Sequence, residues 1–160
     1  MKIVHNLSEQ ELEEKDIYDA IDNDIEDVKL FIENGANIKN PDDYEGPLCY
    51  AYGLNENLER INIMKLLLEG GADPDYFNSG INIETLLFKV IRDGDDEVFE
   101  LLLERGASIE NTDYECMTPL HIASKCGRNE YVRLLLEKGA NIEHRDVDGK
   151  TPLHAAKNEE

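Results

Sequence analysis

The sequence is short of basic residues and of long apolar runs. It has 16 Lys and Arg against 36 Asp and Glu, which gives a formal net charge of −20 over 160 residues. This charge repels a phosphate backbone or an anionic lipid surface and favours a basic partner. No apolar stretch approaches the roughly 20 residues that a membrane-spanning helix needs. We therefore expect neither nucleic-acid binding nor membrane insertion.

Cysteine is also scarce. Cys49, Cys116 and Cys126 are odd in number and form no CxxC pair, which favours reduced thiols over a disulfide framework. The first residues, Met1 to Lys15, lack the apolar segment of a secretory signal peptide. The sequence therefore predicts a cytoplasmic protein.

The overall composition is that of a folded protein. Hydrophobic residues make up 41% and charged residues 32%, far from the low hydrophobicity of disordered chains. The length suits one compact domain or one short array of repeats. We predict a single domain over residues 1–160.

An internal repeat organises the chain. A Gly-Ala pair recurs at intervals of 36, 35 and 33 residues, beginning at Gly35, Gly71, Gly106 and Gly139. Each pair follows an apolar run of helical character, and glycine suits the left-handed residue just beyond a helix end. The runs are Val28–Ile32, Ile63–Leu68, Val98–Leu103 and Val132–Leu136.

A second landmark marks helix starts. Thr118-Pro-Leu-His-Ile-Ala123 and Thr151-Pro-Leu-His-Ala-Ala156 lie 33 residues apart. Threonine caps helix N-termini through its hydroxyl group, and proline is tolerated at the first helical position. In the same register Thr85 precedes Leu86 and keeps the predicted cap without proline or histidine, and Gly46-Pro-Leu takes this place in the second repeat.

The Gly-Ala and Thr-Pro-Leu-His motifs in one register resemble the ankyrin repeat. The resemblance implies an all-α ankyrin-repeat solenoid of about four helix pairs plus a C-terminal half repeat, with short hairpin fingers between repeats. Leu67, Leu102 and Leu135 are expected deep in its core. The predicted repeats are residues 12–38, 39–74, 75–109, 110–142 and 143–160.

Catalytic and metal-site motifs give no support for an enzyme. The chain has no phosphate-binding GxxxxGK[ST] loop, no HExxH and no GxSxG. Cys116, His121 and Cys126 have the spacing of a metal set, but His121 belongs to the Thr-Pro-Leu-His cap and Cys116 takes the usual hairpin glycine position. We expect no catalysis, no metal and no cofactor, with a metal-dependent hydrolase as a distant alternative.

The predicted finger tips combine aromatic and acidic residues. Aligned tips would form a rail of aromatic side chains fringed by acids, which are the residue types that anchor interfaces and select basic partners. For any single tyrosine, packing on the neighbouring finger is an equally good explanation. The ends of the inner helices would line the adjoining surface. The candidate partner-binding residues are Asp42, Asp43, Tyr44, Glu45, Tyr76, Phe77, Arg92, Asp93, Tyr114, Glu115, Met117 and Lys125.

For function, the resemblance implies protein binding on the concave face made by fingers and inner helices. With the acidic charge, it predicts a non-catalytic interaction module, monomeric when free, that binds a basic protein. One role that fits is an inhibitor or immunity-type protein of a toxin or nuclease. The alternative is an adaptor or host-directed effector fragment that recruits a cellular partner.

Overall fold

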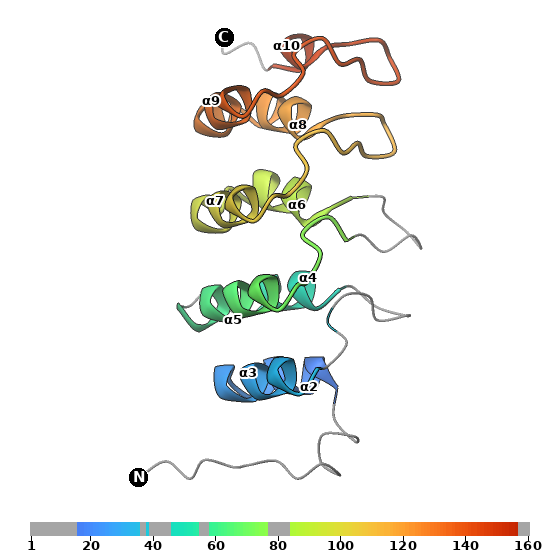
Figure 1. Cartoon of the computed structure of the whole chain (residues 1–160). Helices are drawn as coiled ribbons and strands as arrows, with labels where there is room; N and C mark the ends of the chain where they lie inside the picture. Colours follow the sequence, from blue (N-terminus) through green and yellow to red (C-terminus); the bar gives the residue numbers. More distant parts are fainter. Residues whose placement is uncertain (1–15, 36–37, 39–45, 55–57, 77–83, 157–160) are drawn as a thin grey trace. The chain divides into compact units, whose positions relative to one another are not determined.

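The computed structural model describes residues 16–35, 38, 46–54, 58–76 and 84–156. The chain divides into two compact units, Met1–Asp73 and Pro74–Glu160. Every regular element in the described ranges is an α-helix (Figure 1). The predicted all-α class is therefore confirmed.

The first unit contains two helix pairs. Its helices are α2 (Ile17–Asn23), α3 (Ile25–Glu33), α4 (Pro47–Tyr52) and α5 (Leu58–Glu69). Helix α2 packs on α3 and α4 on α5, while α2 also contacts α4 and α3 contacts α5. The two pairs are thus stacked, with like helices side by side.

The second unit repeats this arrangement. It contains α6 (Leu86–Asp93), α7 (Asp96–Glu104), α8 (Pro119–Lys125), α9 (Asn129–Glu137) and α10 (Pro152–Ala155). Helices α6 and α7 form one pair and α8 and α9 the next, and α8 lies between α6 and α10. The inner helices α6, α8 and α10 therefore form one row.

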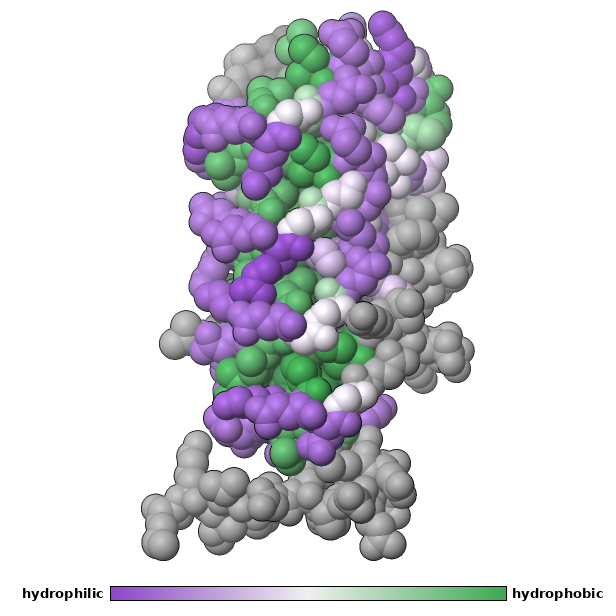
Figure 2. All heavy atoms as spheres, viewed as in Figure 1, coloured by the Kyte–Doolittle hydropathy of each residue, from purple (hydrophilic) through white to green (hydrophobic). Residues whose placement is uncertain are grey.

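The apolar runs predicted from the sequence form the cores of the two units. Leu67, Leu102 and Leu135 are each 0% exposed, as expected. Hydrophilic residues gather over the outside of the helix pairs, with apolar residues visible between them (Figure 2). Because a helix pair of this length cannot bury its apolar stripe alone, stacking on a neighbour is what stabilises it.

Local sequence explains where the helices begin and end. The carboxylates of Asp16 and Asp24 accept hydrogen bonds from backbone amides in the first turns of α2 and α3. Pro47, Pro119 and Pro152 occupy first helical positions. The glycines of the Gly-Ala pairs have positive φ values, as the helix-end interpretation requires; they are Gly35, Gly71, Gly106 and Gly139.

Thr85 precedes a helix as predicted, but the predicted cap through its hydroxyl group is wrong. Thr85 does precede α6, but its buried hydroxyl has no hydrogen-bond partner among the described residues. Thr118 occupies the equivalent place before α8. Its hydroxyl oxygen lies 2.9 Å from Nδ1 of His121. The third helical position after Thr85 holds Phe88, which offers no such partner.

Two hairpin fingers are described, at residues 113–117 and 146–150. In the first, the amide of Asp113 donates to the carbonyl of Met117, and in the second the amide of Asp146 donates to the carbonyl of Lys150. A further bond, from the amide of Val147 to the carbonyl of Glu115, joins the two fingers. These fingers project from the same side of the second unit (Figure 1).

Candidate functional site

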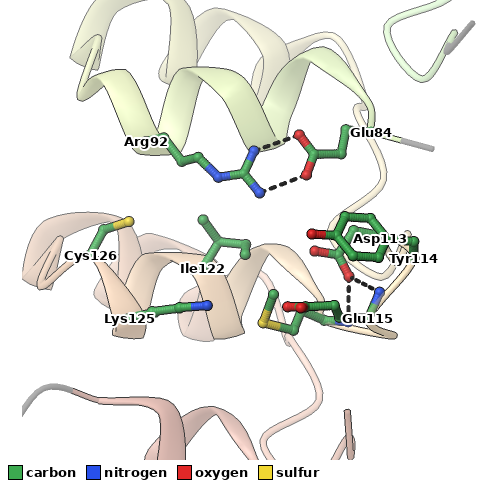
Figure 3. A pocket seen from close by; sticks show the side chains of 9 residues that line it. Glu84, Arg92, Asp113, Tyr114, Glu115, Ile122, Lys125 and Cys126 are labelled. Carbon is green, nitrogen blue, oxygen red and sulfur yellow. Dashed lines mark hydrogen bonds and ion pairs between the residues drawn. The ribbon is translucent and has the colours of Figure 1, made fainter. Parts of the chain in front are cut away.

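A pocket of about 550 Å³ lies in the second unit, between the inner helices α6 and α8 and the 113–117 finger. Its volume is within the range of ligand-binding pockets. Figure 3 shows its side chains converging from both helices and from the finger. Those lining it are Glu84, Arg92, Asp113, Tyr114, Glu115, Met117, Ile122, Lys125 and Cys126.

One wall of the pocket is an ion pair within a single repeat. Both terminal nitrogens of Arg92, at the end of α6, donate to the carboxylate of Glu84, at 2.6 and 2.7 Å. The hydrogen bonds that Arg92 donates to Glu84 raise the pKa of Arg92 above its ordinary value, and the nearby charge of Asp113 contributes in the same direction. Glu84 therefore neutralises Arg92 and fixes the orientation of its guanidinium plane.

The opposite wall is the 113–117 finger. Oδ1 of Asp113 accepts from the amides of Glu115 and Met117, each at 2.9 Å. Asp113 is buried, at 4% exposed, while Tyr114 beside it is 65% exposed. A buried carboxylate thus closes the finger, and an exposed aromatic ring stands next to it.

The pocket has an acidic balance and an apolar floor. Glu84, Asp113 and Glu115 supply three carboxylates, against the two basic groups of Arg92 and Lys125. Ile122 and Met117 are buried at its base. An apolar floor beneath a few fixed polar groups is a usual composition of ligand-binding pockets.

The structure brings five of the predicted site residues together at this pocket: Arg92, Tyr114, Glu115, Met117 and Lys125. Asp93 is exposed at the end of α6, and Tyr76 is half-buried in the segment before it; neither lines the pocket. The remaining candidates, Asp42, Asp43, Tyr44, Glu45 and Phe77, lie outside the described residues.

Met117 is not the exposed tip residue that we expected from the sequence. It is only 6% exposed, because its backbone pairs with Asp113 at the base of the finger and its side chain turns inward. It can contribute to binding only as part of the pocket floor. Of the predicted aromatic and apolar tip residues that are described, Tyr114 is the one that is exposed.

Sequence reasoning missed Glu84 and Asp113. A signal existed for each. Glu84 directly precedes the cap residue Thr85, so an acid stands just before α6 and a base, Arg92, stands in its last turn. Asp113 opens a turn, where aspartate commonly accepts hydrogen bonds from the amides that follow.

The described residues show neither a metal-binding cluster nor a membrane-spanning helix. They contain no group of three or more His, Cys, Asp or Glu side chains placed to hold a metal ion. None of the helices in the same ranges is both long and apolar enough to cross a membrane.

A model of the ankyrin repeat, in three copies, matches residues 17–113 and again residues 87–160. The chain belongs to the ankyrin repeat family. Ankyrin repeats are modules of protein–protein interaction, so this is the class of function that the family assigns. The family is typically non-catalytic.

Two viral relatives extend this finding. An ankyrin repeat protein of Acanthamoeba polyphaga mimivirus is 34% identical over 98 residues, which cover 61% of this chain and 12% of the relative. An ankyrin repeat protein of fowlpox virus is 27% identical over 135 residues, covering 66% of this chain and 18% of the relative. The chain thus spans less than a fifth of the length of either relative.

Proposed function

We propose that this ankyrin-repeat chain binds a basic protein without catalysing a reaction, through the surface made by its fingers and inner helices. The pocket carries the proposal, because it joins α6, α8 and the 113–117 finger around an acidic centre. An exposed tyrosine beside acids is a combination that anchors interfaces and selects basic partners. The net charge of −20 would also speed encounter with a basic protein.

The biological role has two forms that differ in what the partner does. As an inhibitor or immunity-type protein, the chain would cover the basic cleft of a toxin or nuclease. As an adaptor or host-directed effector, it would recruit a cellular protein whose activity continues. We favour a cytoplasmic setting, in which the thiols of Cys49, Cys116 and Cys126 stay reduced, and a monomeric unbound state.

Capture from a native lysate on the tagged chain, followed by mass spectrometry, tests the proposal. The expected result is a basic protein whose association slows as salt is raised, since charge steering is screened. Adding the chain to the purified partner then separates the roles. Stoichiometric loss of the partner's activity indicates an inhibitor, and full activity in the complex indicates an adaptor.

Tyr114→Ala locates the interface, with Val147→Ala as its matched control. Both side chains are 65% exposed and occupy the same place in successive fingers. Tyr114→Ala should weaken binding by at least about 2 kcal/mol, the usual hot-spot threshold, while Val147→Ala leaves it unchanged. Glu115→Gln should chiefly lower the association rate in surface plasmon resonance. Unchanged affinity of folded Tyr114→Ala would move the interface away from this finger.

A further inference from the structure

We infer that the pocket receives one arginine side chain of the partner, and that Asp113 binds its guanidinium group. This inference rests on the proposed function, because it names the chemistry by which the same surface recognises a basic protein. Its central observation is an acceptor atom that the fold does not use.

That atom is Oδ2 of Asp113. It is buried and has no hydrogen-bond donor among the described residues, in a side chain that is only 4% exposed. The finger uses Oδ1 alone, since the amides of Glu115 and Met117 both donate to that atom. A buried carboxylate oxygen without a donor destabilises the fold, so a donor from outside the chain would relieve a cost already present.

Asp146, the equivalent residue of the 146–150 finger, shows which aspartate contacts the turn itself needs. It lies 33 residues after Asp113, and its Oδ1 accepts from the amides of Asp148 and Lys150 in the same pattern. Asp146 is half-buried, however, and the 146–150 finger forms with no fully buried carboxylate. In both fingers the turn amides donate to Oδ1, so the turn leaves Oδ2 unused in each, but the finger geometry does not account for the burial of that oxygen at Asp113.

Arg92, one of the two cations that line the pocket, is hydrogen-bonded to Glu84 and not to Asp113. Arg92 faces the finger across the pocket, but both of its terminal nitrogens are bound to Glu84 (Figure 3). With Arg92 neutralised in this way, Asp113 and Glu115 leave the finger side of the pocket acidic. A cationic group entering there meets opposite charge at the place where the unused acceptor lies.

Arginine fits this pocket better than lysine for two reasons. A guanidinium group is planar and presents several donors in a fixed fork, so it can bind Asp113 and stack on the ring of Tyr114 together. Its methylene stem is apolar, and Ile122 and Met117 provide an apolar floor for it. A lysine ammonium is a compact, strongly hydrated charge and gains less from the ring.

Entry of the arginine requires a side chain to move, because Oδ2 has no contact with solvent. Tyr114 is the exposed group drawn beside the Asp113 carboxylate in Figure 3. Rotation of its side chain opens the way to Oδ2 and then places the ring over the bound guanidinium. Exposed side chains change rotamer rapidly, so this step does not limit binding.

Three short blocked peptides test the inference: Gly-Arg-Gly, Gly-Lys-Gly and the neutral isostere Gly-citrulline-Gly. Each is titrated into the full chain while backbone amide signals are followed by nuclear magnetic resonance. We expect saturable shifts for the arginine peptide at Asp113, Tyr114 and Ile122, weaker ones for lysine and none for citrulline. Equal responses to all three peptides, or shifts spread over the whole acidic surface, would overturn the inference.

Asp113→Asn is the decisive variant, with Asp146→Asn as its control. Asparagine keeps the acceptor that each finger needs and removes the charge. Asp113→Asn should weaken the arginine peptide about tenfold, as expected for loss of a charged hydrogen bond, without lowering the melting temperature. Asp146→Asn should leave peptide affinity unchanged. Equal losses in both variants, or peptide affinity unaltered in folded Asp113→Asn, would refute the assignment.

Failure of this inference is distinguishable from failure of the proposed function. If a captured protein binds Asp113→Asn as tightly as it binds the original chain, the arginine pocket is refuted while protein binding stands. If the arginine peptide binds at Asp113 but the chain captures no protein, the pocket stands and the proposed function fails. If the captured protein is recognised through the pocket, replacing one of its arginines with lysine reproduces the loss seen in Asp113→Asn.

Discussion

Nε2 of His121 lies 3.1 Å from the carbonyl oxygen of Lys150, which is in the next finger. Nδ1 of the same ring accepts from the amide of Thr118 at 3.2 Å, so the proton of the neutral imidazole is on Nε2. His121 is 0% exposed. One buried side chain therefore fixes the start of α8 and ties that repeat to the finger that follows.

Replacing His121 should be far more costly than replacing His154. His154 makes the same contact with the amide of Thr151 but is exposed. We expect His121→Ala to lower the free energy of unfolding by about 3 kcal/mol, because it leaves a cavity and unsatisfied backbone groups. His154→Ala should cost about 1 kcal/mol or less. Urea denaturation of both variants checks this, and equal losses would contradict it.

Gly94 should tolerate alanine less well than Gly106. Both have positive φ values, 81° and 84°, so both substitutions carry the same backbone strain. A Cβ at Gly94 would also lie 2.5 Å from the guanidinium carbon of Arg128, whereas nothing lies within 4 Å at Gly106. Displacing Arg128 breaks its 2.9 Å hydrogen bond to the carbonyl of Arg92.

The difference between these two alanine variants isolates the Arg128 contact. We expect Gly106→Ala to cost about 1 kcal/mol and Gly94→Ala about 1 kcal/mol more. Thermal melts followed by circular dichroism measure both. Combining Gly94→Ala with Arg128→Ala should remove most of the difference, and a double variant that remains fully additive would argue against this explanation.

Cys116 is a position where glycine should stabilise the chain. Its φ of 57° is the only positive value at a non-glycine residue among those described, and Gly149 has φ 77° at the equivalent place in the next finger. We expect Cys116→Gly to raise the free energy of unfolding by about 0.5 kcal/mol, since relief of backbone strain exceeds the added entropy of the unfolded chain. Gly149→Ala should have the opposite sign. Chemical denaturation under reducing conditions measures both effects.

Tyr131 should make the native state sensitive to alkaline pH. Its hydroxyl donates to Asp96 at 2.7 Å and its ring stacks on Phe99 with centroids 4.0 Å apart. Burial, with the hydrogen bond to Asp96, raises the pKa of Tyr131 above its ordinary value. A raised pKa in the folded state means that stability is complete below about pH 10 and is lost as pH rises past the unfolded value.

The variant Tyr131→Phe tests whether Tyr131 causes this loss of stability at alkaline pH. The variant keeps the stacking on Phe99, and it should lose about 1 to 2 kcal/mol at neutral pH through the missing hydrogen bond. Its further decline above about pH 10 should be shallower than that of the original chain. Urea melts across this pH range give the comparison, and parallel curves for the two proteins would show that Tyr131 titrates normally.

The last helix should open more easily than the rest of the second unit. Helix α10 has four residues, and Leu153 on it is 83% exposed, whereas Leu120 at the equivalent position of α8 is 2% exposed. We expect fast amide exchange at Ala155 and Ala156, because few buried contacts oppose local opening. Hydrogen exchange of the free chain measures this. Protection there as strong as in α8 would contradict the expectation.

The repeat was readable from the sequence because its signals are local. A glycine beyond a helix end and a proline at a helix start act through the backbone of their own neighbours, so Gly139 and Pro119 mark boundaries without reference to the rest of the chain. The predicted repeat boundaries and the single domain over residues 1–160 remain predictions. The structure itself divides into two compact units. The helices and their core leucines were predicted from the spacing of the apolar runs together with the resemblance to the ankyrin repeat.

The pocket was predicted only in part. Tyr114, Glu115 and Lys125 stood out by residue type and position, but Met117 was misplaced because the inward turn of its side chain follows from pairing with Asp113. Asp113 itself was missed. Nothing in an Asp-Tyr-Glu segment tells which oxygen the finger will use or whether the other will be covered.

The sequence by itself determined the helix pairs, their order and the acidic character of the surface, because periodicity, caps and charge are properties of neighbouring residues. The tertiary structure alone decided that Glu84 would bind Arg92 and that Asp113 would be left with a buried, unused acceptor. Burial and pairing depend on what the next repeat brings against a side chain. Asp113 and Asp146 make the same local turn, and only their surroundings give them different exposure.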